Sequence, residues 1–141
     1  MDQAPTQRLL HDPASQRTAD HRRLAQQLCD VVDGRQILLP AKFIEIMGLD
    51  IASFASNAHV HRSTVIRAPA AESIQSHIRT SLRVLAAARE TSGGDLEASI
   101  LWYRNEPRAP LAYKTAETLV AEGRADAVID LLESYQAGFV G

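Results

Sequence analysis

Four residues whose side chains could contact nucleic acid lie close together in the segment HRSTVIRA, residues 61–68. They are Arg62, Ser63, Thr64 and Arg67. An arginine guanidinium can form paired hydrogen bonds with a guanine edge or bind a phosphate, and hydroxyl groups can bond phosphates or base edges. If a helix begins near Arg62, its outward face carries Arg62, Ser63, Ile66 and Arg67. The residue types and their spacing therefore fit a DNA-contacting helix.

The surrounding segment IASFASNAHVHRSTVIRA, residues 51–68, has the spacing of a helix-turn-helix. Ala55 is small enough to let two helices approach closely, and the apolar positions suited to burial at a steep crossing are Phe54, Ala58, Val60, Val65 and Ala68. His59 stands where the turn usually has glycine, and histidine tolerates a positive φ better than most residues. The alternative is a pair of short packed helices with no role in DNA binding.

Helix signals recur along the rest of the chain. Thr18 is expected to cap a helix that buries Leu24, Leu28, Val31 and Val32 and ends at Gly34, with Cys29 as a buried free thiol. Pro40, Asp50, Asp95 and Thr115 mark the starts of further helices, and Gly48 ends one. The segment 70–91 has a helical stripe of Ile74, Ile78, Leu82, Leu85 and Ala86. No strand is expected, so the predicted fold class is all-α.

The charges are distributed unevenly around a net charge of −2. Residues 59–90 carry +3 and residues 95–141 carry −4 when histidines are counted as neutral. A region with so few positive charges would bind DNA weakly as a monomer, because affinity grows with the number of phosphates neutralised. DNA binding therefore implies a homodimer on a palindrome. The 70–91 stripe could form the pairing surface or belong to the core of one chain.

The sequence lacks the motifs expected of an enzyme, a metalloprotein or a membrane protein. None of the five histidines belongs to a recognisable catalytic motif, and there is no H-E-x-x-H, G-x-S-x-G or glycine-rich phosphate loop. One cysteine without partners at ligand spacing predicts neither a disulfide nor a metal site. No apolar run approaches the ~20 residues that span a bilayer, and no signal peptide is evident. We expect a cytoplasmic protein without a catalytic site, metal or cofactor.

From Asp95 onward, an ordered set of residues resembles the toxin-binding domain of the Xre/MbcA/ParS antitoxin family. A helix containing Trp102 is followed by Asn105, Pro107 and Leu111, then by a helix that ends in Glu-Gly, and by a last helix that closes on Gly138 and an apolar residue. The matching positions are Trp102, Asn105, Pro107, Leu111, Leu119, Gly123, Ala127, Val128, Leu132 and Gly138. The chain departs from the family at Ala112, where glycine is usual, and at Lys114, where proline is usual.

The resemblance implies a fold and a function. Residues 1–17 have two prolines and little periodicity and are expected to form a flexible arm, and the spacing in residues 18–91 predicts a helix-turn-helix and dimerisation region. The resemblance implies that residues 92–141 form a small helical toxin-binding domain. The chain would be the antitoxin of a type II toxin–antitoxin system. Its partner would be a RES-domain toxin that consumes NAD or uses it for ADP-ribosylation, and the chain would also repress its own operon by binding operator DNA.

The end of the sequence, YQAGFVG, suggests how such a toxin could be blocked. Gly138 would end the last helix, so that Phe139, Val140 and the carboxylate of Gly141 enter the active-site cleft of the toxin, with Tyr113, Tyr135 and Gln136 as further toxin contacts. Phe139 could instead pack back against its own core, as Trp102 is expected to do. The alternative function is a plain helix-turn-helix repressor whose C-terminal domain dimerises or binds an effector.

Overall fold

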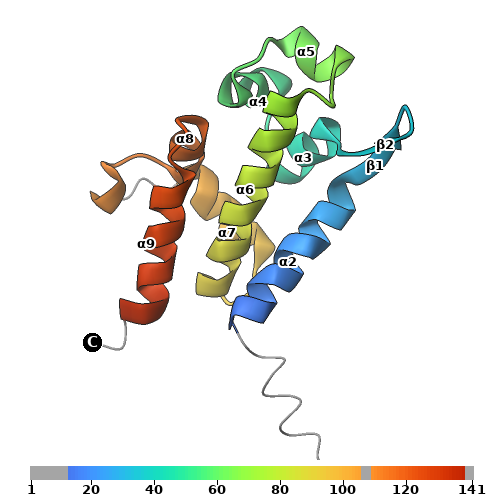
Figure 1. Cartoon of the computed structure of the whole chain (residues 1–141). Coiled ribbons are helices and arrows are strands. Elements are labelled where there is room, and N and C mark those ends of the chain that lie inside the picture. The colour runs from blue at the N-terminus through green and yellow to red at the C-terminus, as the bar shows by residue number, and fades with distance from the viewer. Residues whose placement is uncertain (1–12, 106–108, 139–141) are drawn as a thin grey trace, which may run out of the picture.

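The computed structural model describes residues 13–105 and 109–138, most of which are helical (Figure 1). The prediction of a mainly helical fold is therefore confirmed, except for two short strands. In chain order the elements are α2 (Pro13–Leu28), β1 (Cys29–Val32), β2 (Arg35–Leu38), α3 (Pro40–Met47), α4 (Ile51–Ala58), α5 (Arg62–Arg67), α6 (Glu72–Thr91), α7 (Leu96–Asn105), the 3-10 turn η1 (Ala109–Leu111), α8 (Ala116–Ala121) and α9 (Ala125–Gly138).

The first described helix differs from the predicted one at both ends. It begins at Pro13, so Thr18 lies inside it and is not its N-cap, and the last five residues of the predicted arm, 13–17, are helical. Proline is favoured at a helix start because its missing N–H has no partner there anyway. The helix ends at Leu28 rather than at Gly34, and Leu24 and Leu28 are buried as expected.

An antiparallel hairpin of β1 and β2 follows, so the expectation of no strands is wrong. Cys29 pairs with Leu38, and Val32 pairs with Arg35. The loop between the strands is Asp33–Gly34, with φ of 51° and 77°, and positive φ at both loop residues is the type I′ geometry that matches the twist of a hairpin. As a result Cys29 is half-buried rather than buried, and Val31 is 64% exposed.

The predicted helix boundaries are confirmed at most other positions. Pro40 lies in the first turn of α3, and Gly48 ends this helix in the left-handed region at φ 68°. Asp50, Asp95 and Thr115 each accept a hydrogen bond from the backbone N–H three residues later, which satisfies one of the unpaired donors at a helix start. The helix expected over 70–91 begins at Glu72.

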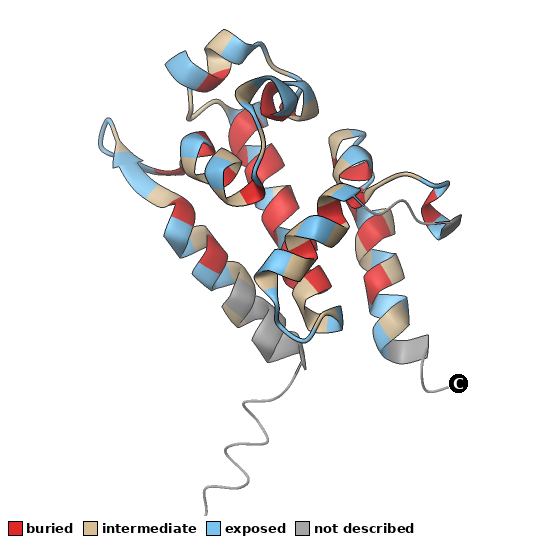
Figure 2. Cartoon of the chain, turned by 180° about the vertical axis from the view of Figure 1, so that it is seen from behind, coloured by how far each residue is buried: buried red, intermediate tan, exposed pale blue. Residues whose placement is uncertain are grey.

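Helix α6 runs through the centre of the molecule and packs against α2, α3, β2, α4, α7, α8 and α9 (Figures 1 and 2). Residues are buried on more than one of its faces, as expected of a helix enclosed by others. They include the predicted stripe and the residues between: Ile74, His77, Ile78, Ser81, Leu82, Val84, Leu85, Ala86, Ala87 and Ala88. The stripe is therefore core of a single chain and is not available as a pairing surface.

One hydrophobic cluster holds both halves of the sequence together. It extends from Leu24 in α2 to Leu132 in α9 and includes residues on both sides of the predicted boundary between 91 and 92. No helix in the described ranges is both long enough and apolar enough to cross a membrane.

Hydrogen bonds of two buried side chains, Gln75 and Tyr103, fix the position of α6. The amide of Gln75 donates to the carbonyls of Leu38 and Pro69 at 2.8 Å each, and its oxygen accepts from the N–H of Leu38 at 2.9 Å. The Tyr103 hydroxyl donates to Ser81 Oγ at 3.1 Å from α7. Since buried polar groups are costly when unpaired, these contacts favour one orientation of α6 relative to the hairpin and α7.

His77 lies on α6 against two aromatic rings. Its ring contacts Phe43 at 6.3 Å and Phe54 at 5.6 Å between centroids, both in edge-to-face geometry, and only 9% of the residue is exposed. Burial, with a smaller contribution from His59, lowers the pKa of His77 to about 4. Its imidazole is therefore neutral at pH 7.

This low pKa predicts a loss of stability in mild acid. Between pH 6.5 and 4 the unfolded state binds a proton at His77 that the folded state does not bind, so the free energy of unfolding falls as the pH falls. Between pH 7 and 5 we expect a loss on the order of 2 kcal/mol from this group. Urea unfolding at the two pH values should show that His77→Leu abolishes this loss, whereas the exposed His61→Leu retains it. An equal loss in His77→Leu would contradict the assignment.

Candidate nucleic-acid interface and partner surface

The α4–α5 pair has the compact packing expected from its apolar spacing. Phe54, Ala55, Ala58 and Val65 are buried, and Val60 is half-buried against the core. Ala68 is exposed, so its predicted burial is wrong. It follows the last residue of α5, where the chain has already left the helix at φ −133° and ψ 62°.

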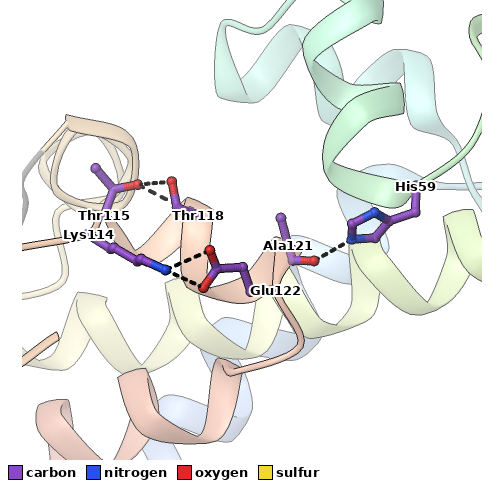
Figure 3. Close-up of polar contacts among 6 residues, drawn as sticks. All are labelled: His59, Lys114, Thr115, Thr118, Ala121 and Glu122. Atoms are coloured by element: carbon purple, nitrogen blue, oxygen red, sulfur yellow. Dashed lines mark hydrogen bonds and ion pairs between the residues drawn. The ribbon is translucent and has the colours of Figure 1, made fainter. Parts of the chain in front are cut away.

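The turn between the two helices is attached to the C-terminal half of the chain by His59. This residue ends α4 in the left-handed region at φ 59°, in agreement with the expected positive φ. Its Nε2 lies 2.5 Å from the carbonyl oxygen of Ala121 at the end of α8 (Figure 3). A carbonyl can only accept, so His59 Nε2 is the protonated nitrogen. A glycine in this turn could not form the bond.

Two of the predicted DNA-contacting residues on α5 are exposed, and a third forms hydrogen bonds with the residue that caps this helix. Arg62 and Arg67 are exposed, and Ile66 between them is 70% exposed. Ser63 is half-buried, and its hydroxyl lies 2.9 Å from His61 Nδ1, which also accepts from the Ser63 N–H at 3.2 Å. Thr64 is half-buried as well. The outward face is therefore made mainly of two guanidinium groups with an aliphatic side chain between them.

The loop between η1 and α8 holds Tyr113 in an exposed and unusual conformation. Ala112 and Tyr113 have φ of 57° and 59°, a region that costs a non-glycine residue roughly 1–2 kcal/mol. Tyr113 is 75% exposed. Glycine would adopt the conformation of Ala112 without this cost.

Contacts on both sides keep this loop in place. Leu111 is buried before it and accepts a hydrogen bond from the Lys114 N–H at 3.1 Å. Lys114 Nζ then contacts both carboxylate oxygens of Glu122, at 3.0 and 2.8 Å, and Thr115 caps α8 (Figure 3). Strained backbone persists only where its surroundings determine it, and such positions cluster at binding sites.

The other predicted toxin contacts are dispersed. Tyr135 and Gln136 on α9 line a groove of about 740 Å³ between the end of α6, α7 and α9, and Trp102 lines the same groove while packing against the core. Tyr113 is not among the groove residues. The predicted plug residues Phe139, Val140 and Gly141 lie outside the described residues.

A further link connects α7 to the start of the α4–α5 pair. Arg104 Nη1 donates to the carbonyls of Met47 and Gly48, at 3.1 and 3.0 Å, and so caps the C-terminus of α3. Arg104 also acts on the charge of Glu117 in α8, whose pKa is raised by burial and lowered less strongly by Arg104 and Asn57. His59 thus fixes the α4–α5 turn to α8, and Arg104 fixes the end of α3, just before α4, to α7.

No protein-family model, curated protein or solved structure matches this chain. Within the described ranges, no group of three or more histidine, cysteine or acidic side chains is arranged to hold a metal ion.

The double role of His59 predicts different effects of two substitutions. His59→Ala loses the bond to Ala121, worth roughly 0.5–1.5 kcal/mol, and retains the cost of the positive φ. His59→Gly loses the same bond but removes that cost, so it should be about 1 kcal/mol more stable than His59→Ala. Urea unfolding measures both variants. Equal stability of the two would contradict a strained backbone at residue 59.

Proposed function

We propose that this chain is the antitoxin of a type II toxin–antitoxin system, with a RES-domain, NAD-using toxin as its partner and its own operator as its DNA target. The support is the ordered set of residues in the C-terminal half together with the exposed basic face of α5. Leu111, Leu119, Val128 and Leu132, which carry the resemblance, are all buried. They are thus suited to specify the core of a small helical partner-binding region.

The face of α5 is the observation that carries the DNA-binding part of the proposal. Arg62 and Arg67 can bind phosphates or form paired hydrogen bonds with guanine, and Ile66 can contact a thymine methyl group. Burial of Phe54 and Val65 holds α5 against α4 so that these side chains face outward. A helix-turn-helix presents its second helix to the major groove in this manner.

The small number of cations on α5 requires two copies on a palindromic operator. The stripe of α6 is buried within one chain, so the proposed homodimer pairs through another surface. A plain repressor with an effector-binding C-terminal region is the alternative. It would share the DNA contacts but would not bind the product of a neighbouring toxin gene.

For the toxin-binding part, Tyr113 is the strongest anchor among the described residues. Tyrosine is enriched at binding hot spots, and a loop whose backbone is already held by neighbouring contacts loses less entropy on binding. Residues 95–141 carry −4, which would complement a basic nucleotide-binding cleft and steer association. The predicted insertion of Phe139, Val140 and Gly141 into that cleft stays a prediction.

Arg62→Ala with Arg67→Ala tests the DNA interface. The double variant should bind the DNA upstream of its own gene much more weakly, and the slope of log K against log salt should become shallower by about 0.9 for each phosphate that is no longer neutralised. Fluorescence anisotropy at several salt concentrations measures both quantities. Arg22→Ala, an exposed arginine on α2, is the matched control and should bind as the wild type does. Unchanged binding by the double variant would disprove the assignment of α5.

Tyr113→Ala tests the partner surface. Removal of a tyrosine anchor from an interface costs about 2 kcal/mol, so the affinity for the product of the adjacent reading frame should fall about 30-fold. Tyr113→Phe should retain most of the affinity, and Leu101→Ala, which removes another exposed apolar side chain, should have no effect. Titration calorimetry with the purified partner gives these values. Wild-type affinity in Tyr113→Ala would place the interface elsewhere.

A further inference from the structure

A cleft of about 480 Å³ lies where α4, α6 and the junction of α8 with α9 meet. His59 and Gly123 lie on its walls, and α6 contributes Ser73, Ser76, His77 and Thr80. The bond between His59 and Ala121 joins two of these walls. The cleft is separate from the exposed face of α5 and from the Tyr113 loop.

His77 is the buried polar group of this cleft. Only 9% of the residue is exposed, its ring packs against Phe43 and Phe54, and neither ring nitrogen has a hydrogen-bond partner among the described residues. No His77 nitrogen is among the fully enclosed, unpaired polar atoms of the described residues, so the ring nitrogens are accessible from the cleft that His77 lines. The neutral imidazole offers one donor and one acceptor. A ligand with hydroxyl groups could donate a hydrogen bond to one ring nitrogen and accept one from the other.

Three hydroxyl groups extend this polar surface along α6. Ser73, Ser76 and Thr80 are spaced by three and four residues, so they lie on one face of the helix. At 1.5 Å of rise per residue the row is about 10 Å long. Their hydroxyls have no hydrogen-bond partner within the described part of the chain. Hydroxyls can both donate and accept, which suits a ligand with several groups of the same kind.

The charges at the cleft favour a neutral ligand. Arg83 lies on the wall, but its guanidinium is 3.4 Å from the carboxylate of Asp126, which also lines the cleft. The two formal charges cancel, and the carboxylate would repel an anion. Since His77 is neutral at pH 7, the cleft offers hydrogen bonds and no net charge.

We propose that this cleft binds a neutral polyhydroxylated molecule of about the size of a disaccharide or a ribonucleoside, with its hydroxyl groups on His77 and on the row Ser73, Ser76 and Thr80. The volume is within the ~300–1,000 Å³ of small-molecule sites. Because the ligand would touch both α4 and the α8–α9 junction, its binding would alter how α5 is held. This last step rests on the proposed DNA-binding function.

Calorimetric titration of the full chain with maltose and with adenosine, in the absence of DNA and of any partner protein, tests the site. At least one of these probes should bind, and Ser76→Leu should weaken that binding at least about tenfold by filling the cleft. Ser134→Leu, an equivalent change on the exposed side of α9, should leave it unchanged. His77→Phe, which keeps the ring and removes the nitrogens, should weaken it to a similar extent, with circular dichroism confirming that the variant is folded.

Three outcomes would overturn the proposal. The first is that neither probe binds up to about 10 mM, which corresponds to less than roughly 3 kcal/mol of binding free energy. The second is that binding survives both Ser76→Leu and His77→Phe. The third is that inorganic phosphate binds and Ser76→Leu abolishes this binding, while neither neutral probe binds. A probe that binds but leaves DNA affinity unchanged would contradict only the coupling to α5. Failure of the chain to bind DNA at all would count against the proposed function and not against the cleft.

Discussion

Enclosure of α6 is the constraint on which the rest of the structure depends. Apolar residues on several of its faces are removed from water by helices from both halves of the chain, and each fully buried aliphatic side chain contributes about 1.5–3 kcal/mol. Gln75 and the Ser81–Tyr103 pair then fix the rotation of α6 about its axis and its position among the other helices. The surrounding helices are positioned by this central helix, and so are the surfaces that they carry.

The attachment of the α4–α5 pair to the C-terminal half follows from this arrangement. His59 bonds to the end of α8, and Arg104 caps α3 from α7. A DNA-contacting helix and a partner-binding loop would therefore be parts of one mechanical unit. The cleft beside His59 and His77 is lined by α4 and by the α8–α9 junction, so an occupant would contact both of these elements.

The sequence was sufficient to predict helices whose ends carry strong local chemistry. Asp50, Asp95 and Thr115 were identified as caps because a short side-chain acceptor there satisfies a free backbone N–H. The hairpin is not predicted because Val31 and Val32 continue the apolar period of α2, and Gly34 stands where that helix could end. The dipeptide Asp33–Gly34 is a strong signal for a two-residue hairpin loop and favours two strands over a continued helix.

Other features of the site depend on tertiary contacts and could not be predicted. The spacing of residues 51–68 indicated a positive φ at His59, but not that its ring would reach Ala121, which lies 62 residues away. The capping of α3 by Arg104 likewise joins residues far apart in the sequence. Ala112 and Tyr113 carry no local signal for positive φ, because neither is glycine or asparagine. Their conformation follows from the anchoring of Leu111 and Lys114.

The most direct test of the proposed function is NAD turnover by the product of the adjacent reading frame, measured with and without this chain. The partner should consume NAD when it is alone, and stoichiometric addition of this chain should form a stable complex in which consumption stops. Continued NAD consumption in the presence of the folded chain, without formation of a complex, would contradict the proposal.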